Sequence, residues 1–346
     1  VAWLCEKTNK SILNLTETDY NENNLSELLM EKSYDDLNLD LYKRIHRSIT
    51  GWPGGKPDSD DKARPERSKP AKKRVLILSP HPDDDVISMG GTFDRLVSQG
   101  HEVHVAYQTS GNIAVSNSDV LRYLEVINST FPDCECENDE LIEMLKNSSD
   151  IINNSRIREI AATIREKESL AATRFIGIPD NQVHFLKLPF YETGTIKKNI
   201  PNVEDKKIIS ETIKKIKPHQ IYAAGDLADP HGTHKVCLDI LFDSLKDLKS
   251  KTFMNDCWVW LYRGAWHEWP IHEIDMAVPM SPFQVLRKRK AIFYHQTQKD
   301  NVMFQGDDNR EFWVRTEDRN RAIAKKFRNI GMSDYTAIET FKRYHF

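Results

Sequence analysis

The chain has 346 residues, 39% of them hydrophobic, which suffices for one large α/β domain with appendages. Its 49 Lys and Arg nearly balance its 52 Asp and Glu, leaving a net charge of −3. Nucleic-acid-binding proteins usually carry a strong basic field, so this balance argues against nucleic acid and favours a small-molecule partner. Because the apolar start at Val1 is too short for a signal peptide and no run approaches the roughly 20 apolar residues of a membrane span, we expect a cytoplasmic protein.

Residues 1–50 contain short helical patterns with too few apolar residues for an independent core. Residues 51–73 begin with Gly51-Trp52-Pro53 and continue with a stretch dense in Asp, Lys, Arg and Pro, which is typical of a linker. We therefore expect the helical tail of another domain at 1–50, a linker at 51–73 and the main domain at 74–346.

After the linker, short apolar runs alternate with longer amphipathic ones. The short runs predict strands at 75–78, 103–107, 183–188 and 221–224. The longer ones predict helices at 86–98, about 157–175, about 205–216 and about 234–248. This alternation predicts a three-layer α/β fold with a doubly wound, mostly parallel sheet. In such sheets ligands bind beyond the carboxyl ends of the strands, so the residues that follow strands are the functional candidates.

Two loops that follow predicted strands contain histidine and aspartate. They read Ser79-Pro80-His81-Pro82-Asp83-Asp84-Asp85 and Asp229-Pro230-His231-Gly232-Thr233-His234. A catalytic zinc ion typically takes three imidazole or carboxylate ligands from the protein, and His81, Asp84 and His234 can supply them. Aspartates at helix starts are also common N-caps, so either loop alone would be interpreted as a solvent-exposed helix start without a metal. Together, at strand ends of one sheet, they favour a metal site.

At these residues the chain resembles the LmbE-like or PIG-L deacetylases, which remove acetyl from N-acetylglucosamine carried on lipid, inositol or other groups. The resemblance covers about residues 73–300. It depends on Pro80-His81-Pro82-Asp83-Asp84, on His231-x-x-His234, on Arg165-x-x-Glu168, on Thr109-Ser110-Gly111 and on Lys290-Ala291 leading to His295-x-x-Gln298.

The resemblance implies a Rossmann-like LmbE fold and a Zn²⁺ ion held by His81, Asp84 and His234, although another divalent transition metal would suit the same ligands. It implies that Asp83 is the general base and that His231 faces the developing oxyanion or the leaving group. Many family members read His-Pro-Asp-His where this chain has Gly232 and Thr233 between the histidines, and threonine cannot supply the missing carboxylate. A polar insertion between about 115 and 150 could shape a substrate entrance.

The combination of the Gly51-Trp52-Pro53 segment with this motif also resembles bacterial fusions to a glucosamine-6-phosphate deaminase-like domain. Residues 1–50 would then be the end of the deaminase-like half. The sequence shows no deaminase active-site motif, so we assign no deaminase activity to this chain.

Five aromatic residues fall close together at Trp258, Trp260, Tyr262, Trp266 and Trp269. The first three alternate, which more often indicates one buried face of a strand. Trp266 and Trp269 lie in a predicted loop and are the better candidates for stacking on a sugar ring. Arg165 and Arg263 could bind hydroxyl or phosphate oxygens of the same substrate.

The sequence therefore predicts a zinc-dependent hydrolase of a linear amide bond, acting on the acetamide of an N-acetylglucosamine-type amino sugar. Zinc with Asp83 would activate water, and zinc with His231 would stabilise the oxyanion. Either Asp83 or His231 could protonate the leaving amine. Two alternatives stay open: a catalytically weak metal-binding or regulatory domain, and a magnesium-dependent phosphoesterase, against which two histidine ligands argue. A homo-oligomer is compatible with the sequence.

Overall fold

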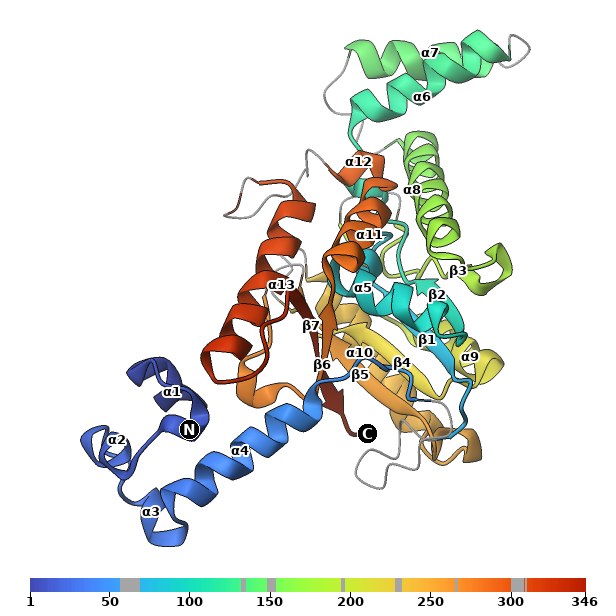
Figure 1. Ribbon diagram of the computed structural model, residues 1–346. Helices are drawn as coiled ribbons and strands as arrows, with labels where there is room; N and C mark the ends of the chain where they lie inside the picture. The colour runs from blue at the N-terminus through green and yellow to red at the C-terminus, as the bar shows by residue number, and fades with distance from the viewer. Residues whose placement is uncertain are drawn as a thin grey trace.

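The computed structural model describes residues 1–56, 69–131, 135–147, 154–193, 197–227, 232–264, 267–299, 308 and 310–346, with the side chains of 135–137 set aside. These residues form a seven-stranded sheet in the order β3-β2-β1-β4-β5-β7-β6 (Figure 1). The strands are β1 (Arg74–Ser79), β2 (Glu102–Tyr107), β3 (Val183–Phe185), β4 (Gln220–Ala224), β5 (Trp258–Tyr262), β6 (Met276–Met280) and β7 (Ala337–Tyr344).

The sheet is mostly parallel and changes winding direction at β1. Strands β3, β2, β1, β4 and β5 pair in parallel, whereas β7 is antiparallel to both β5 and β6. The chain runs outward from β1 to β2 and β3, and then returns to place β4 on the other side of β1. The carboxyl ends of the neighbouring strands β1 and β4 therefore form the topological switch point, where doubly wound sheets bind their ligands. The predicted fold class is confirmed, and the antiparallel pair of β6 and β7 adds an edge that the sequence did not predict.

Helices cover both faces of this sheet and extend beyond it at two places. They are α1 (Ala2–Thr8), α2 (Glu17–Glu22), α3 (Leu28–Glu31), α4 (Tyr34–Ser48), α5 (Asp84–Ser98), α6 (Asn117–Thr130), α7 (Glu135–Asn147), α8 (Ser155–Ile176), α9 (Val203–Ile216), α10 (Thr233–Leu248), α11 (Pro282–Phe293), α12 (Gln296–Lys299) and α13 (Phe312–Asn329). Among the helices described, none combines the length and the apolar character needed to cross a membrane.

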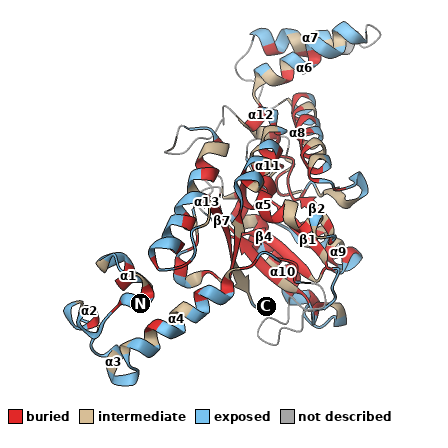
Figure 2. Cartoon of the chain, viewed as in Figure 1, coloured by how far each residue is buried: buried red, intermediate tan, exposed pale blue. Residues whose placement is uncertain are grey.

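The alternation of side chains along β1 divides the core into two layers. Leu76 and Leu78 pack in one cluster with residues of α9 and α10, whereas Val75 and Ile77 pack in another with residues of α5 and α11. Strand residues are accordingly buried along most of the sheet, and the helices keep an exposed outer face (Figure 2). Burial of both sheet faces explains why the parallel strands read as nearly continuous apolar runs.

The N-terminal helices α1 to α4 pack against α13 and the edge of the sheet. Leu4 and Tyr20 are wholly buried in the same cluster as Phe327, and the backbone N–H of Ile12 donates to the carbonyl of Ile330 at 3.0 Å. Beyond α4, the N–H of Thr50 donates to the carbonyl of Ala277 in β6 at 2.8 Å. The origin of residues 1–50 in a deaminase-like domain stays a prediction, and residues 57–68 of the expected linker lie outside the described chain.

The predicted insertion forms the helices α6 and α7. Val120 and Leu124 of α6 pack with Leu145 of α7 and with Ile157 and Ile164 of α8. Figure 1 shows the pair projecting past α8 and α12, away from the sheet. The insertion therefore has its own small apolar cluster and depends on α8 for its attachment.

Candidate metal centre

The residues that could hold a metal lie at the switch point of the sheet. His81 and Asp84 follow β1 directly, and His234 is the second residue of α10, which follows β4. The backbone between β1 and α5 turns sharply at Asp83, whose φ of 149° is unusual for a residue other than glycine. Such a conformation costs about 1–3 kcal/mol and is typically kept where it positions functional groups.

The three predicted ligands are brought together. Oδ2 of Asp84 lies 3.1 Å from Nδ1 of His81 and 3.1 Å from Nε2 of His234. One ligand atom from each of the three residues falls within 4.8 Å of the others. Tetrahedral ligands with bonds of about 2.1 Å are spaced by about 3.4 Å, so this donor set fits a single divalent ion. The side chain of His81 is 20% exposed while Asp84 and His234 are nearly enclosed, which leaves the His81 side as the open approach.

A backbone carbonyl determines the tautomer of His234. Nδ1 of His234 lies 3.0 Å from the carbonyl oxygen of Asp226, just after β4. A carbonyl oxygen can only accept, so Nδ1 carries a proton, and Nε2 is the nitrogen that faces Asp84. This arrangement, with one ring nitrogen held by a backbone oxygen and the other directed at the ligand cluster, is usual for metal-binding histidines.

The electrostatics of Asp84 also suit a ligand. Burial alone would raise the pKa of Asp84, but the charges and hydrogen bonds of His234 and His81 lower this pKa far below its usual value. The backbone N–H of His81 donates to the same oxygen at 2.9 Å. Asp84 is therefore held as a carboxylate over the whole physiological pH range.

The neighbouring Asp83 has a different partner. Its Oδ2 lies 3.2 Å from Nη2 of Arg165, a residue of α8 that is only 1% exposed. Burial raises the pKa of Asp83 to about 6, although the positive charge of Arg165 opposes the rise. A carboxyl group with a pKa near neutrality can exchange a proton at physiological pH, as a general base must.

Some groups near the site were given no role from the sequence. Asp85 is fully buried and accepts a hydrogen bond from the Tyr107 hydroxyl at 2.9 Å, and burial raises its pKa to about 7. The ring of Tyr191 meets that of His81 edge-on, with centroids 6.1 Å apart. Tyr191 lies after β3 in a segment without a recognisable pattern, so its proximity to His81 depends on the tertiary fold.

His295 is a second neighbour, noted in sequence only as part of a motif. It is fully buried, and within the described residues neither of its ring nitrogens has a hydrogen-bond partner. Burial, with a further contribution from the nearby Arg165, lowers the pKa of His295 to about 3, so the ring is neutral. Glu168 of α8 fixes this segment by accepting hydrogen bonds from the backbone N–H and the hydroxyl of Thr297, both at 2.8 Å.

The predicted substrate-binding residues are scattered. The predicted substrate-binding residue Trp266 and the predicted catalytic residue His231 lie outside the described residues. Trp269 is 5% exposed and its indole N–H donates to the carbonyl of Leu261 at 3.1 Å. The guanidinium of Arg263 covers the ring of Trp269 at 3.6 Å and donates to the carbonyl of Gly225 at 3.0 Å. Trp269 and Arg263 thus pack with each other beside β4 and β5, and little of the Trp269 ring is accessible to a ligand.

Comparison with known proteins agrees with this geometry. Residues 76–244, which contain most of β1, all of β4 and all three candidate ligands, match the model of the PIG-L family, described as GlcNAc-PI de-N-acetylase. The chain is also 49% identical over 357 residues to a glucosamine-6-phosphate deaminase-like protein of Bacteroides thetaiotaomicron, covering 99% of this chain and 54% of that protein. The chain thus spans about half the length of this relative.

The fold is similar to that of the N,N′-diacetylchitobiose deacetylase from Pyrococcus horikoshii, with a TM-score of 0.51 and 21% identity. The match covers 82% of this chain and 87% of the archaeal protein. At that identity the likeness concerns the fold alone. The segment that matches the PIG-L family model, residues 76–244, also contains the ligand cluster and the switch point between β1 and β4.

Proposed function

We propose that this chain is a metal-dependent deacetylase that hydrolyses the acetamide of an N-acetylglucosamine-type amino sugar. The observation that carries the proposal is the pairing of two adjacent carboxylates with different partners at the switch point. Asp84 faces His81 and His234, whereas Asp83 faces Arg165. Metal-assisted hydrolysis of an amide uses both metal ligands and a separate proton acceptor, and this division supplies both.

The proposed ligands are His81, Asp84 and His234, and two imidazoles with one carboxylate favour Zn²⁺ over Mg²⁺. When bound, such an ion would polarise the acetyl carbonyl and lower the pKa of water. Asp83 would take the proton from the attacking water. Arg165 would hold the Asp83 carboxylate in place and keep it ionised. We retain His231 as the group that stabilises the oxyanion or protonates the leaving amine.

Two comparisons with known proteins support an amino sugar as the substrate. The family description names the removal of an acetyl group from an N-acetylglucosamine conjugate. The relative from Bacteroides thetaiotaomicron carries glucosamine 6-phosphate in its name. The sugar unit is common to both, while the group attached to it differs.

The test is a measurement of acetate release from N-acetylglucosamine, N,N′-diacetylchitobiose and N-acetylglucosaminyl-phosphatidylinositol by metal-free protein reconstituted with Zn²⁺. Para-nitrophenyl phosphate is included to detect phosphoesterase activity. We expect Zn²⁺-dependent acetate release from at least one amino sugar and none from His234→Ala protein. Phosphate release without acetate release would assign the site to the phosphoesterase class instead.

A catalytically weak, metal-binding domain is the second candidate, and the residue between the two distal histidines favours it. Thr233, at the position where many relatives carry aspartate, is fully buried, and its hydroxyl accepts a hydrogen bond from Nζ of Lys198. Lys198 also lies 5.4 Å from the centre of the Tyr191 ring, which in turn meets His81. Thr233 therefore supplies no carboxylate next to His234, and the ammonium group of Lys198 lies beside it. Full zinc occupancy without acetate release from any of the three sugars would favour this candidate.

A further inference from the structure

Arg158 of α8 is a buried cation that the proposed chemistry does not use. The residue is only 6% exposed. Within the described residues, the Nε and Nη2 atoms of its guanidinium are buried and have no hydrogen-bond partner. Buried polar groups are nearly always paired, and an unpaired buried charge is destabilising. A buried guanidinium with two unbonded nitrogens is therefore a candidate for contact with a ligand.

The position of Arg158 on α8 relates it to the metal centre. Arg158 precedes Arg165 by seven residues, so the two arginines lie on the same face of the helix, two turns and about 10 Å apart. Arg165 contacts Asp83 and the carbonyl of Pro82, in the loop that follows β1. Arg158 thus belongs to the same wall as Arg165, at a distance that a hexose with one substituent can span.

The segment after β3 connects Arg158 with the open side of the metal centre. Burial lowers the pKa of Arg158, and Tyr191 and Glu192 are close enough to oppose this shift. The ring of Tyr191 meets that of His81 edge-on. The two oxygens of Glu192 accept hydrogen bonds from the backbone N–H and the hydroxyl of Ser110, at 2.8 and 2.9 Å, just beyond the carboxyl end of β2. Arg158 therefore borders the approach to His81.

The other cation beside Tyr191 already has a protein partner. Nζ of Lys198 lies 5.4 Å from the centre of the Tyr191 ring and donates a hydrogen bond to the hydroxyl of Thr233. Arg158 is thus the group here whose donors are left for a ligand. An arginine is protonated at any physiological pH, and its planar fork of N–H groups matches two oxygens of a phosphate or a carboxylate.

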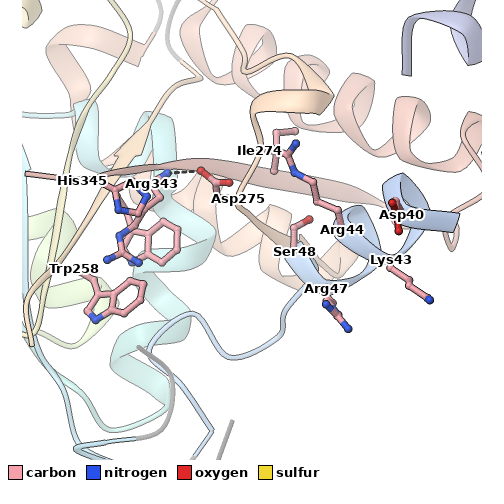
Figure 3. Close-up of a pocket in the computed structure, with 11 residues that line it drawn as sticks. Asp40, Lys43, Arg44, Arg47, Ser48, Trp258, Ile274, Asp275, Arg343 and His345 are labelled. Carbon is pink, nitrogen blue, oxygen red and sulfur yellow. Dashed lines mark hydrogen bonds between the residues drawn. The ribbon is translucent and has the colours of Figure 1, made fainter. Parts of the chain in front are cut away.

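The arginines of a cavity elsewhere in the molecule provide a contrast. This cavity has a volume of about 500 Å³ and lies between α4 and the strands β5 and β7 (Figure 3). Arg44 donates there to the carbonyl of His272 at 2.7 Å, and the guanidinium of Arg343 covers the ring of Trp258, 3.0 Å from its centre. Protein groups engage these two arginines, whereas no described residue is hydrogen-bonded to Nε or Nη2 of Arg158.

We propose that Arg158 binds an anionic group, a phosphate or a carboxylate, that the amino-sugar substrate carries. The proposal rests on the deacetylase function proposed above, because it assumes a sugar whose acetamide lies at the ligand cluster. A substituent of that sugar two helical turns along α8 would then meet the guanidinium of Arg158. The negative charge would pair the buried cation and replace the water that Arg158 has lost on burial.

The test compares acetate release from N-acetylglucosamine with release from its 1-phosphate, its 6-phosphate and N-acetylmuramic acid, which carries a carboxylate. The protein is reconstituted with Zn²⁺. We expect a higher kcat/KM for at least one acidic sugar than for the neutral one, and the preferred sugar tells whether phosphate or carboxylate is recognised. Arg158→Gln should reduce this preference by about tenfold or more, because a charge-assisted contact is lost, and Arg158→Lys should retain part of it.

The matched control is Arg156→Gln, which removes an exposed charge from the same helix. This variant should keep the wild-type preference. A defect in folding would lower kcat/KM for acidic and neutral sugars by the same factor, so such a result in Arg158→Gln would overturn the proposal. A wild-type protein without preference for any acidic sugar would also overturn it.

Isothermal titration distinguishes failure of this proposal from failure of the deacetylase function. The same four sugars are titrated into wild-type, Arg158→Gln and Arg156→Gln proteins. Saturable binding of an acidic sugar that is weakened only in Arg158→Gln, without acetate release from any sugar, would support the anion site and contradict the deacetylase function. Acetate release from N-acetylglucosamine, combined with equal affinity for acidic and neutral sugars, would support the deacetylase function and overturn the anion site.

Discussion

Nη2 of Arg165 lies 3.2 Å from Oδ2 of Asp83 and donates a hydrogen bond to the carbonyl of Pro82 at 2.5 Å. A single buried guanidinium thus ties two successive residues of the His81–Asp85 loop to α8. It also holds the Asp83 carboxylate away from the histidines that contact Asp84. The different environments of two adjacent aspartates depend on this contact more than on their order in the sequence.

The first prediction concerns the pH dependence of turnover. Burial raises the pKa of Asp83 to about 6, and Arg165 opposes that rise. Activity should fall as pH decreases through this pKa, because a protonated Asp83 cannot accept a proton. Arg165→Gln removes the opposing charge, so the pKa should rise further and the acid limb of kcat/KM should move to higher pH.

The control is Arg156→Gln, which removes an exposed charge from the same helix. Its pH profile should coincide with that of the wild type. An acid limb that is unmoved in Arg165→Gln, or that moves equally in both variants, would show that Arg165 does not tune Asp83.

The second prediction concerns the ligands. Asp84→Ala removes the oxygen that contacts both histidines, so metal content and activity should fall together. Asp85→Asn is the comparison, because Asp85 lies next in sequence but pairs with Tyr107. Elemental analysis of both purified proteins should find metal in the Asp85 variant and little in the Asp84 variant. Full metal occupancy in Asp84→Ala would exclude Asp84 as a ligand.

The third prediction separates the two loop tryptophans. Trp269 is buried with its indole N–H bonded to Leu261, so Trp269→Ala should lower the free energy of unfolding by about 3–5 kcal/mol. Trp266→Ala, if Trp266 stacks on the sugar, should weaken substrate binding by about 1 kcal/mol with little change in stability. Urea denaturation and KM measurements distinguish the two effects. A stable Trp269→Ala protein with a raised KM would instead place Trp269 in the substrate site.

The fourth prediction concerns a buried ion pair. Nζ of Lys288 lies 2.7 Å from Oε1 of Glu339, and both side chains are 1% exposed. Glu339 also accepts the backbone N–H groups of Gly91 and Thr92 in α5, at 3.0 and 2.6 Å. Lys288→Met should cost about 3–5 kcal/mol, because it leaves a buried carboxylate without its counter-charge.

The exposed pair of Lys235 and Asp239 provides the reference for this ion pair. Lys235→Met should change stability by less than about 1 kcal/mol, since exposed pairs contribute little. Denaturant midpoints for the two variants give the comparison. Similar small losses in both would show that the buried pair is not required for the packing of α5 on β7.

The parallel half of the fold could be predicted because each strand is short, apolar and followed by a turn and an amphipathic helix. The cluster of possible ligands could be predicted for a related reason: His81 and Asp84 follow β1, and His234 lies just beyond β4. The antiparallel strands β6 and β7 could not be predicted, because their place in the sheet depends on the pairing of β7 with β5 and of β6 with β7. Local pattern carries no signal for that pairing.

The surroundings of the site were less predictable than its ligands. Trp269 occurs beside Pro270 in an apparent loop, yet it is buried, because its indole packs under Arg263 against β5. Tyr191 and His295 come from segments far from the motif in sequence and reach the site only through tertiary packing. The sequence singles out His295 only as part of a motif and does not single out Tyr191, so the proximity of both residues to the site is known only from the folded chain.

The proposed roles of Asp83 as general base and Asp84 as metal ligand are tested most directly by measuring metal content and acetate release together in wild-type and Asp83→Asn proteins. We expect one equivalent of a transition metal in both proteins, acetate release by the wild type, and turnover of the variant reduced by about 10²–10⁴-fold. Contradiction would come from an Asp83→Asn protein that has lost its metal, or from one that retains the metal and full turnover.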